Sequence, residues 1–565
     1  MSIYKSLSEE RKYLQSIGEL PEWITTNSYQ MLKEKYLEEG ESLRDRYRSI
    51  AYTAALYMPK DFHTIWMERF FTILWNGWLA ASTPVLANMG KPSGCPVSCS
   101  GGYIGDSVYD FYNGQVEVAM LSKNGFGTSG YLGDIRERGA PINNMKGGAS
   151  GIVPVFKDYV QVARDISQGS SRRGAWAGYI PIDHPDFDEL VTHISKFPDD
   201  ANVGWNITDS FISRLKSGDE EAIRRYQKTL KLKMVTGKGY YFFVDKVNRL
   251  NPEWYKDKDI EVLASNLCTE ITLPSTINET FTCVLSSLNY SKYNEWKNTD
   301  TIFDSLVFLH CVAENFIDIG RKIRGLEKAV RFTKNHMALG LGALGFHTYL
   351  QDKRIPLESM EAYYENISIF KELNEKTLEA SKWLTKEFGE CSVTSGYGVA
   401  NSHRIAVAPN LSSALICGGV SQGIEPVYKN AYVQGTSSGE MNRINPSLIK
   451  VLKEYGEYND ETIESIIDNN GSVQHLSFLT DNDKAVFKTA FEIDQKQLIR
   501  LASARQRYID QAQSINLFFS ADEDEEYISE VHQLAFEDPY IKSLYYIRSE
   551  SGVQASKGEC VACEG

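Results

Sequence analysis

Apolar and charged residues are mixed at helical spacing over the first 80 residues of the chain. The stretch LKEKYLEEGESLRDRYRSIAYTAALYM is typical of this region and predicts amphipathic helices. Beyond Ala81 the pattern changes, because short strand-like runs such as KMVTGKGYYFFV, TFTCVLSSLNY and RIAVAPN alternate with helical stretches. Such alternation indicates an α/β fold with parallel strands.

Glycine is dense between residues 81 and 180, in runs such as SGGY, KNGFGTSGYLGD and KGGASG. Glycine at this density marks tight turns and places where the backbone approaches a ligand. The chain ends in SESGVQASKGECVACEG, whose small and polar residues predict a flexible tail. We therefore divide the chain into a helical region (1–80), an α/β region (81–545) and a tail (546–565).

The composition restricts the partners more than the fold. The 565 residues are 42% hydrophobic, which is enough for a large core, and their formal net charge is −14. An acidic chain is a poor candidate for binding a nucleic acid polymer, because that binding depends on Lys and Arg. The N-terminus lacks a secretory signal, and no apolar run has the length of a membrane span. These features predict a cytoplasmic protein that has no association with a membrane.

Two stretches match the dinucleotide-binding pattern G-x-G-x-x-G, at residues 125–130 and 340–345. That fold needs a strand before the motif, and the preceding sequences, VEVAMLSKN and RFTKNHMA, do not read as strands. We interpret both as glycines used for packing and turns. None of the nine histidines follows a Glu by three positions, so the ligand pair of di-iron carboxylate bundles is missing. A radical made at such a site would have to come from another protein.

The strongest local signal is the pentapeptide NLCTE, in which Asn266, Cys268 and Glu270 alternate. Alternate side chains of an extended segment point to the same side, so an amide, a thiol and a carboxylate would face one site. A half-buried strand with a chance pattern explains the pentapeptide equally well. The choice between the two depends on the other cysteines.

The nine cysteines are odd in number, which argues against complete disulfide pairing. Cys99 opens the glycine-rich region, and Cys283 lies shortly after the pentapeptide. Cys560 and Cys563 form C-x-x-C in the tail, a spacing that suits dithiol–disulfide exchange. Half of a zinc site and a tail without function are the alternatives, although the tail lacks the two further ligands that zinc needs.

In combination, these residues resemble a ribonucleotide reductase, specifically the large (alpha, catalytic) subunit of class I. The similar segments are STPVLANMG, PVSCSGGYIGDS, SQGSSRRGAWA, NLCTE, TCVLSSLN, ALGLGALGF, SQGIEP, SLYYIR and the final C-x-x-C, in the family's order. The resemblance implies a ten-stranded α/β barrel with a central finger loop, preceded by a helical N-terminal region. It also implies that this chain lacks the N-terminal ATP-cone of many large subunits.

The resemblance assigns a role to each residue of the reactive set. Cys268 is expected to carry a transient thiyl radical that removes the 3′ hydrogen of the ribose. Glu270 takes the proton of the 3′-hydroxyl, and Asn266 holds the ribose hydroxyls. Cys99 and Cys283 are the reducing dithiol, although Cys95 is a rival for the place of Cys99. Cys311, Cys391 and Cys417 have no role beyond that of small buried side chains.

Further residues match the family's radical path, tail and nucleotide sites. Tyr545 and Tyr546 are expected to relay the radical, and Cys560 and Cys563 to re-reduce the active-site disulfide. The expected substrate-binding residues are Thr83, Ser98, Arg172, Asn410, Ser412 and Ser413. The expected effector-binding residues are Asp106, Ser107 and Arg136.

The implied reaction is the reduction of ribonucleoside diphosphates to 2′-deoxyribonucleoside diphosphates. We expect no metal and no covalently bound cofactor in this chain, nucleotide effectors (dNTP or ATP) at a specificity site, and a radical metallocofactor in a partner. The expected partners are a ferritin-like small (beta) subunit, thioredoxin or glutaredoxin, and a second copy of the chain in a homodimer. A cobalamin-dependent reductase and a non-catalytic nucleotide-binding regulator are the alternatives.

Overall fold

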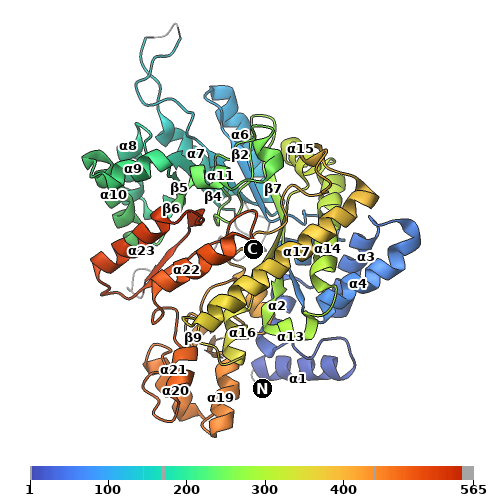
Figure 1. Cartoon of the computed structure of the whole chain (residues 1–565). Coiled ribbons are helices and arrows are strands. Elements are labelled where there is room, and N and C mark those ends of the chain that lie inside the picture. The colour runs from blue at the N-terminus through green and yellow to red at the C-terminus, as the bar shows by residue number, and fades with distance from the viewer. Residues whose placement is uncertain (1–2, 144–145, 167–173, 437–438, 550–565) are drawn as a thin grey trace.

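The computed structural model describes residues 3–143, 146–166, 174–436 and 439–549 (Figure 1). The first part is helical, as predicted, with α1 (Ile3–Ser16), α2 (Thr26–Lys35), α3 (Leu43–Ala55) and α4 (His63–Trp75). The side chains of Thr25 and Ser42 cap the first turns of α2 and α3. The apolar faces of these helices share one core cluster with α14 (Thr301–Gly320) and α17 (Met360–Phe388), so the helical region is packed onto the rest of the chain.

Nine strands of the described residues pair in one sheet, in the order β1-β7-β2-β3-β4-β5-β6-β12, with β8 also beside β7. Strands β2 to β6 run parallel to one another, whereas β7 runs antiparallel to β2 and parallel to β8. The strands are β1 (Leu79–Ala81), β2 (Cys99–Tyr103), β3 (Gly127–Tyr131), β4 (Trp176–Pro181), β5 (Val203–Asn206), β6 (Tyr240–Phe242), β7 (Phe281–Asn289), β8 (Leu339–Leu344) and β12 (Ser543–Leu544).

The two ends of this sheet are joined through the last part of the chain. β8 bridges to Ile405, Val407 bridges to Gln513, and β11 (Leu517–Phe519) pairs in parallel with β13 (Ile547–Ser549), which follows β12. The sheet therefore closes into a barrel, which confirms the predicted α/β barrel class. Residues 405–407 form isolated bridges and backbone hydrogen bonds but no strand, so the main sheet of the described residues has nine strands, against the predicted ten.

Helices surround the barrel, with α8, α9 and α10 on one side and α14 and α17 on the other (Figure 1). The other helices are α5 (Thr83–Asn88), α6 (Val108–Lys123), α7 (Ile152–Asp165), α8 (Phe187–Lys196), α9 (Asp209–Lys216), α10 (Glu220–Thr236), α11 (Val244–Arg249), α12 (Glu253–Lys256), α13 (Tyr293–Trp296), α15 (Glu327–His336), α16 (Phe346–Asp352), α18 (Leu411–Ile416), α22 (Gln495–Gln506) and α23 (Glu525–Glu537). No helix of the described residues is long and apolar enough to cross a membrane.

A small helical unit lies apart from the barrel at the lower edge of Figure 1. It contains α19 (Pro446–Tyr455), α20 (Asp460–Asp468) and α21 (Asp481–Val486), next to a hairpin of β9 (Ala431–Thr436) and β10 (Gly439–Ile444). These elements bury their own apolar cluster.

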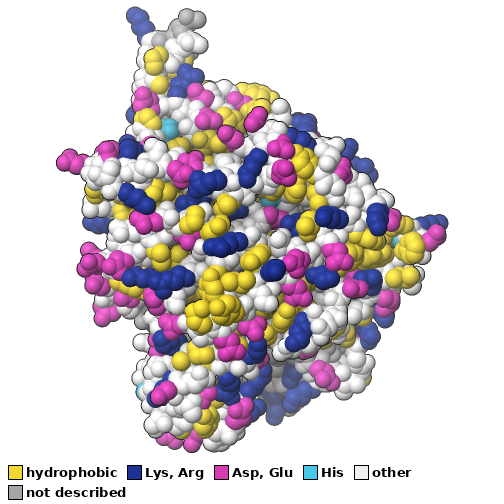
Figure 2. All heavy atoms as spheres, in the orientation of Figure 1, with side chains coloured by type: hydrophobic (Ala, Val, Ile, Leu, Met, Phe, Trp, Pro, Cys, Tyr) yellow, Lys and Arg dark blue, Asp and Glu magenta, His cyan; other side chains and the backbone are white. Residues whose placement is uncertain are grey.

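On the face shown in Figure 2, acidic and basic side chains are interspersed over most of the surface.

The interior of the barrel is occupied by an irregular segment of the chain. Residues 261–280 contain no helix or strand, yet residues 264–275 are all buried. The tip of this segment packs against inward-facing aromatic side chains of β3, β4 and β6, among them Tyr131, Tyr179 and Tyr240. We call residues 261–280 the finger loop, because the position matches the predicted central loop.

Candidate active site

Cys268 lies in a turn at the tip of the finger loop, and not in the extended segment that the alternation of NLCTE predicted. The amide of Thr269 approaches the carbonyl of Asn266 at 3.4 Å, and Thr269 has a φ of +70°. The prediction of a strand was wrong because a loop that enters a barrel must reverse direction inside it. The turn nevertheless brings the side chains together: Nδ2 of Asn266 donates to Oε1 of Glu270 at 2.9 Å and to Sγ of Cys99 at 3.3 Å.

The buried carbonyls of the finger loop are satisfied by side chains and backbone from the barrel wall, as buried backbone groups require. Tyr179 donates its hydroxyl to the carbonyl of Asn266 at 2.6 Å, and Ser514 to that of Cys268 at 2.5 Å. The carbonyl of Thr269 accepts from Ser543 at 3.0 Å, and that of Glu270 accepts from the amide of Ala512 at 2.9 Å. The tip is therefore held on several sides.

Glu270 has a perturbed acidity that suits a base working near neutral pH. The side chain is buried, and this desolvation raises its pKa to about 7, against smaller opposing effects of hydrogen bonds from Asn266 and Ser514. A carboxylate with a pKa near 7 is present in both protonation states around neutrality, which is the condition for efficient proton transfer.

Cys99 and Cys283 are direct neighbours across the antiparallel pair β2–β7. Residues opposite each other in such a pair have Cα atoms roughly 4.5–5.5 Å apart, which is within the range of a disulfide. Both cysteines are buried, and burial raises the pKa of Cys283. The glycine at 340 leaves room for this pair, because a Cβ there would lie 2.9 Å from Sγ of Cys283. The chain thus presents two thiols that can exchange two electrons.

Cys95 is placed away from this pair. It belongs to the large cluster between the N-terminal helices and α14, whereas Cys99 and Cys283 share another cluster. Cys311, Cys391 and Cys417 are buried, as expected.

Tyr545 and Tyr546 lead directly to the finger loop. The hydroxyl of Tyr545 is 3.5 Å from Sγ of Cys268, and the two tyrosine rings stack with centroids 3.8 Å apart. Tyr545 is inaccessible and Tyr546 is buried, with the Arg548 guanidinium 4.8 Å from the centroid of the Tyr546 ring. Three oxidisable side chains are therefore in sequence, from Tyr546 through Tyr545 to Cys268.

Sequence reasoning missed the segment from Gln511 to Asn516, which contacts the dithiol, the finger loop and the tyrosine pair. Nε2 of Gln511 is 3.5 Å from Sγ of Cys283, Oγ of Ser514 is 3.2 Å from Oε2 of Glu270, and Asn516 accepts from the amide of Tyr546 at 3.0 Å. The available signal was the succession of Gln, Gln, Ser and Asn in DQAQSINLFF, a run that ends in apolar residues. Polar side chains that are buried in such a run need hydrogen-bond partners.

The predicted substrate-binding residues are placed unequally. Ser98, Ser412 and Ser413 are buried, and Thr83 is buried with a hydroxyl that has no hydrogen-bond partner among the described residues. The side chain of Asn410 is engaged within the protein: its Nδ2 donates to Oγ of Ser287 and to the carbonyl of Ala343, both at 3.0 Å, and its Oδ1 accepts from the amide of Gly423 at 2.9 Å. Arg172 lies outside the described residues.

The predicted effector-binding residues are brought together at the start of α6. Nε of Arg136 and Oδ2 of Asp106 form an ion pair at 2.6 Å. Ser107 caps α6 by accepting from the amide of Asp110. Exposed apolar side chains continue along the same helix, at Val108, Tyr109, Tyr112 and Val116.

Cys560 and Cys563 lie outside the described residues. The first glycine motif runs into β3 after α6, and the second follows α15 and lies in β8 except for Gly345, so a helix and not a strand precedes each. This confirms their interpretation as packing glycines.

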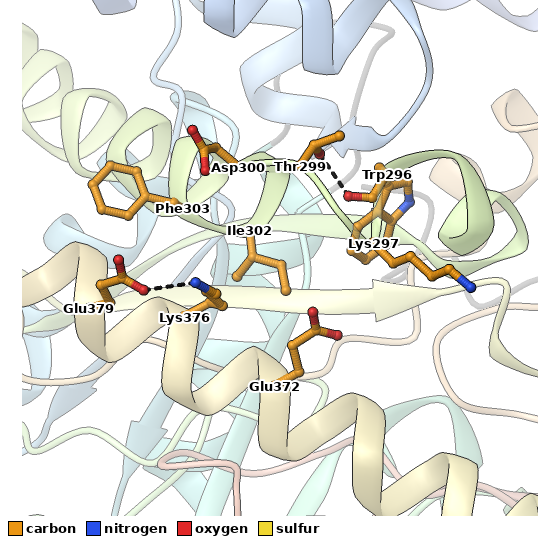
Figure 3. Close-up of a pocket in the computed structure, with 9 residues that line it drawn as sticks. All are labelled: Trp296, Lys297, Thr299, Asp300, Ile302, Phe303, Glu372, Lys376 and Glu379. Carbon is orange, nitrogen blue, oxygen red and sulfur yellow. Dashed lines mark hydrogen bonds and ion pairs between the residues drawn. The ribbon is translucent and has the colours of Figure 1, made fainter.

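A pocket between α13, α14 and α17 lies outside this site (Figure 3). Residues around α13, the start of α14 and the middle of α17 line it, including Lys376 and Glu379, which form an ion pair at 3.0 Å. None of the predicted site residues lines it. No group of three or more His, Cys, Asp or Glu side chains in the described residues could hold a metal ion.

Comparison with known proteins gives one consistent family. The model described as "ribonucleotide reductase, barrel domain" matches residues 97–225, 220–395 and 392–547, and the "all-alpha domain" matches residues 22–94. A putative ribonucleoside-diphosphate reductase large subunit of Frog virus 3 is 34% identical, with 96% of this chain and 99% of that protein covered. The large subunit of Invertebrate iridescent virus 3 is 29% identical, with coverages of 95% and 97%. The solved structure of the Actinobacillus ureae class Id ribonucleotide reductase alpha subunit is 39% identical, with a TM-score of 0.86 and coverages of 95% and 99%.

Proposed function

This chain belongs to the ribonucleotide reductase family as a large subunit, and we propose that it reduces ribonucleoside diphosphates to 2′-deoxyribonucleoside diphosphates with Cys268 as its radical carrier. The observation that carries the proposal is that the Cys268 sulfur contacts Tyr545, while the same loop tip holds the hydrogen-bonded Asn266–Glu270 pair. The cross-strand pair of Cys99 and Cys283 adjoins this tip through the contact between Cys99 and Asn266.

Each side chain has a chemistry that fits one part of the reaction. A thiyl radical on Cys268 removes the 3′ hydrogen of the ribose. A serine in this position could not readily carry the radical. Glu270 accepts the proton of the 3′-hydroxyl, and Asn266 hydrogen-bonds the ribose hydroxyls. One thiol of the dithiol protonates the departing 2′-hydroxyl, which leaves as water. Cys99 and Cys283 supply two electrons and end as a disulfide. Cys268 then returns the hydrogen to C3′, which completes the deoxyribose and regenerates the thiyl radical.

The stacked tyrosines support class I over the cobalamin-dependent class. A radical generated next to Cys268 would not need a relay, whereas a radical from a separate subunit would. The proposed partner is a ferritin-like small subunit whose metallocofactor supplies the oxidising equivalent. Tyr545 and Tyr546 then pass it to Cys268 by oxidation and reduction of neighbouring side chains.

The proposed re-reduction uses the C-terminal cysteines. About 14 residues separate Tyr546 from Cys560, and at roughly 3.3 Å per extended residue they reach about 45 Å. That length allows Cys560 and Cys563 to enter the barrel, reduce the Cys99–Cys283 disulfide, and be reduced in turn by thioredoxin or glutaredoxin.

The proposed nucleotide sites lie at α6 and α18. The Asp106–Arg136 pair and Ser107 would bind a deoxynucleotide or ATP as effector, and Arg172 would lie over the substrate. Ser412 and Ser413 would bind the substrate diphosphate, together with Thr83 and Ser98. Because Asn410 already uses its side-chain amide within the protein, only its backbone is proposed to contribute.

We also propose that the chain forms a homodimer. The exposed Val108, Tyr109, Tyr112 and Val116 give α6 an apolar face that a second copy would cover. The neighbouring effector residues would then lie close to the interface.

The proposed function is tested by turnover. The purified chain is incubated with CDP, dithiothreitol and the small subunit, and dCDP is measured. Formation of dCDP that depends on the small subunit supports the proposal. Turnover with adenosylcobalamin alone would move the chain to the cobalamin class. Nucleotide binding without turnover under either condition would favour a regulator.

A further inference from the structure

Gln511 is fixed beside one sulfur of the dithiol. Its side chain is inaccessible to solvent, and Nε2 lies 3.5 Å from Sγ of Cys283 and 2.8 Å from the carbonyl of Leu339. Its Oε1 accepts from the amide of Thr272 in the finger loop at 3.3 Å. The side chain is thus held at both ends, with an amide N–H directed at the sulfur.

The two sulfurs of the dithiol have different surroundings. Cys283 is inaccessible, whereas Cys99 is 5% exposed. The donor beside Cys99 is Nδ2 of Asn266, which it shares with the carboxylate of Glu270. An incoming thiolate can therefore approach Cys99 more readily. Cys283 is the inaccessible sulfur, and the amide donor beside it, Gln511, is not shared with a carboxylate.

We propose that Gln511 is a positioning residue that makes Cys283 the leaving sulfur when the Cys99–Cys283 disulfide is re-reduced. The inference rests on the proposed function, because it assumes that this disulfide forms during turnover. A thiolate of the dithiol reductant attacks Sγ of Cys99, and a new S–S bond forms as the Cys99–Cys283 bond breaks. The electron pair leaves on Sγ of Cys283. The second thiol of the reductant, as its thiolate, then displaces Cys99, and both cysteines take up protons.

The physical reason lies in the stability of the leaving thiolate. Thiol–disulfide exchange is faster when the leaving sulfur forms a more stable thiolate. Burial disfavours the thiolate and raises the pKa of Cys283, and the hydrogen bond from Gln511 opposes this effect. Without the Gln511 amide, Cys283, the most deeply buried sulfur of the site, would have to leave as a thiolate that lacks this stabilising hydrogen bond.

Trapping the mixed disulfide tests the direction of attack. The chain, with Cys560 and Cys563 replaced by Ser so that only added thiol reduces it, is taken through one round with CDP and the small subunit. Glutathione is then added, the reaction is quenched with acid, and the adduct is located by peptide mass spectrometry. We expect glutathione on Cys99. An adduct on Cys283 would overturn the inference, and this readout needs no change at Gln511.

Substitution of Gln511 tests its contribution, with Gln513 as a matched control. Gln513 is also buried on this segment. Its side chain donates to the carbonyl of Ala502 and to Gln506 and accepts from Arg505, and it has no hydrogen bond to a thiol among the described residues. In Gln511→Met, the dCDP formed in the first round should be unchanged. Re-reduction by dithiothreitol should be roughly tenfold to a hundredfold slower, as expected for loss of a hydrogen bond to a charged group. Gln513→Met should re-reduce at the unsubstituted rate.

The outcomes separate this inference from the proposed function. If no Cys99–Cys283 disulfide is found after one round, the proposed function fails. If the disulfide forms but Gln511→Met is re-reduced at the normal rate, or Gln513→Met is slowed equally, the inference alone fails.

Discussion

Replacing Glu270 by Gln should abolish turnover and, at alkaline pH, stabilise the fold. Gln keeps the size of the side chain and an oxygen to accept from Asn266, but it cannot take a proton from a hydroxyl. Burial raises the pKa of Glu270 from an ordinary 4.5 to about 7, so ionising it inside the barrel costs free energy that Gln does not. Activity and stability should therefore change in opposite directions.

The stability effect has a definite sign and pH window. Because the folded-state pKa is above the unfolded value, the contribution of Glu270 to stability is complete below pH 4.5 and is lost as the pH rises through 7. A shift from 4.5 to about 7, at about 1.36 kcal/mol per unit, corresponds to about 3 kcal/mol above pH 8. The unfolding entropy is roughly 2.1 cal/mol/K for each of the 565 residues. Removal of this ionisation cost in Glu270→Gln should therefore raise the Tm of the variant above that of the unsubstituted chain by about 3 °C.

Calorimetric scans of both proteins between pH 5 and 8.5 measure this difference. The Tm of Glu270→Gln should move above that of the unsubstituted chain as the pH rises. For the unsubstituted enzyme, kcat/KM should increase about tenfold from pH 6 to pH 8, following ionisation of a base with a pKa near 7. Glu314→Gln is the control: burial also raises the pKa of Glu314, but it lies on α14 outside the site, so its activity should be normal. A constant Tm difference across the pH range, or retained turnover in Glu270→Gln, would refute the reasoning.

Three other predictions concern the radical path, the C-terminal cysteines and the support of the finger loop. Tyr545→Phe or Tyr546→Phe removes only a hydroxyl and should leave the circular dichroism spectrum unchanged while dCDP formation is lost, because Phe is much harder to oxidise; normal turnover of either would exclude the relay. Replacing both Cys560 and Cys563 by Ser should stop turnover with a thioredoxin-like protein but spare the first round, with partial rescue by dithiothreitol; normal cycling with the protein reductant would exclude the tail as shuttle. Ser514→Ala removes the hydroxyl that donates to the buried carbonyl of Cys268. It should lower the free energy of unfolding in denaturant titrations by about 1–3 kcal/mol and slow the first round, with nucleotide binding unchanged. Equal stability would show that the hydroxyl does not hold the loop.

The α/β class could be predicted from the pattern of the sequence, whereas the closure of the barrel was expected only from the family resemblance. The change from helical spacing to alternating strands and helices after Ala81 is a local signal, and it was confirmed. Closure depends on two isolated bridges. One joins Ile405 to Leu341, 64 positions earlier, and the other joins Val407 to Gln513, 106 positions later. Contacts of that range leave no periodic pattern in the chain.

The site shows the same division between residue type and geometry. The identity of Asn266, Cys268 and Glu270 pointed to a reactive set, but the argument from strand alternation gave the wrong backbone. The turn at Thr269 arises from the reversal of a buried loop, which the pentapeptide itself does not encode. Gln511 and Ser514 escaped notice because neither is reactive, and their importance comes from what lies next to them in space.

The central claim is that Cys268 removes the 3′ hydrogen of the substrate. The most direct test compares CDP with 3′-deuterated CDP in the presence of the small subunit, for the unsubstituted chain and for Cys268→Ser, with calorimetric binding of a deoxynucleotide effector as evidence of folding. The account predicts slower dCDP formation from the deuterated substrate by the unsubstituted chain, and none from either substrate by Cys268→Ser despite normal effector binding. Formation of dCDP by Cys268→Ser at a comparable rate would contradict it.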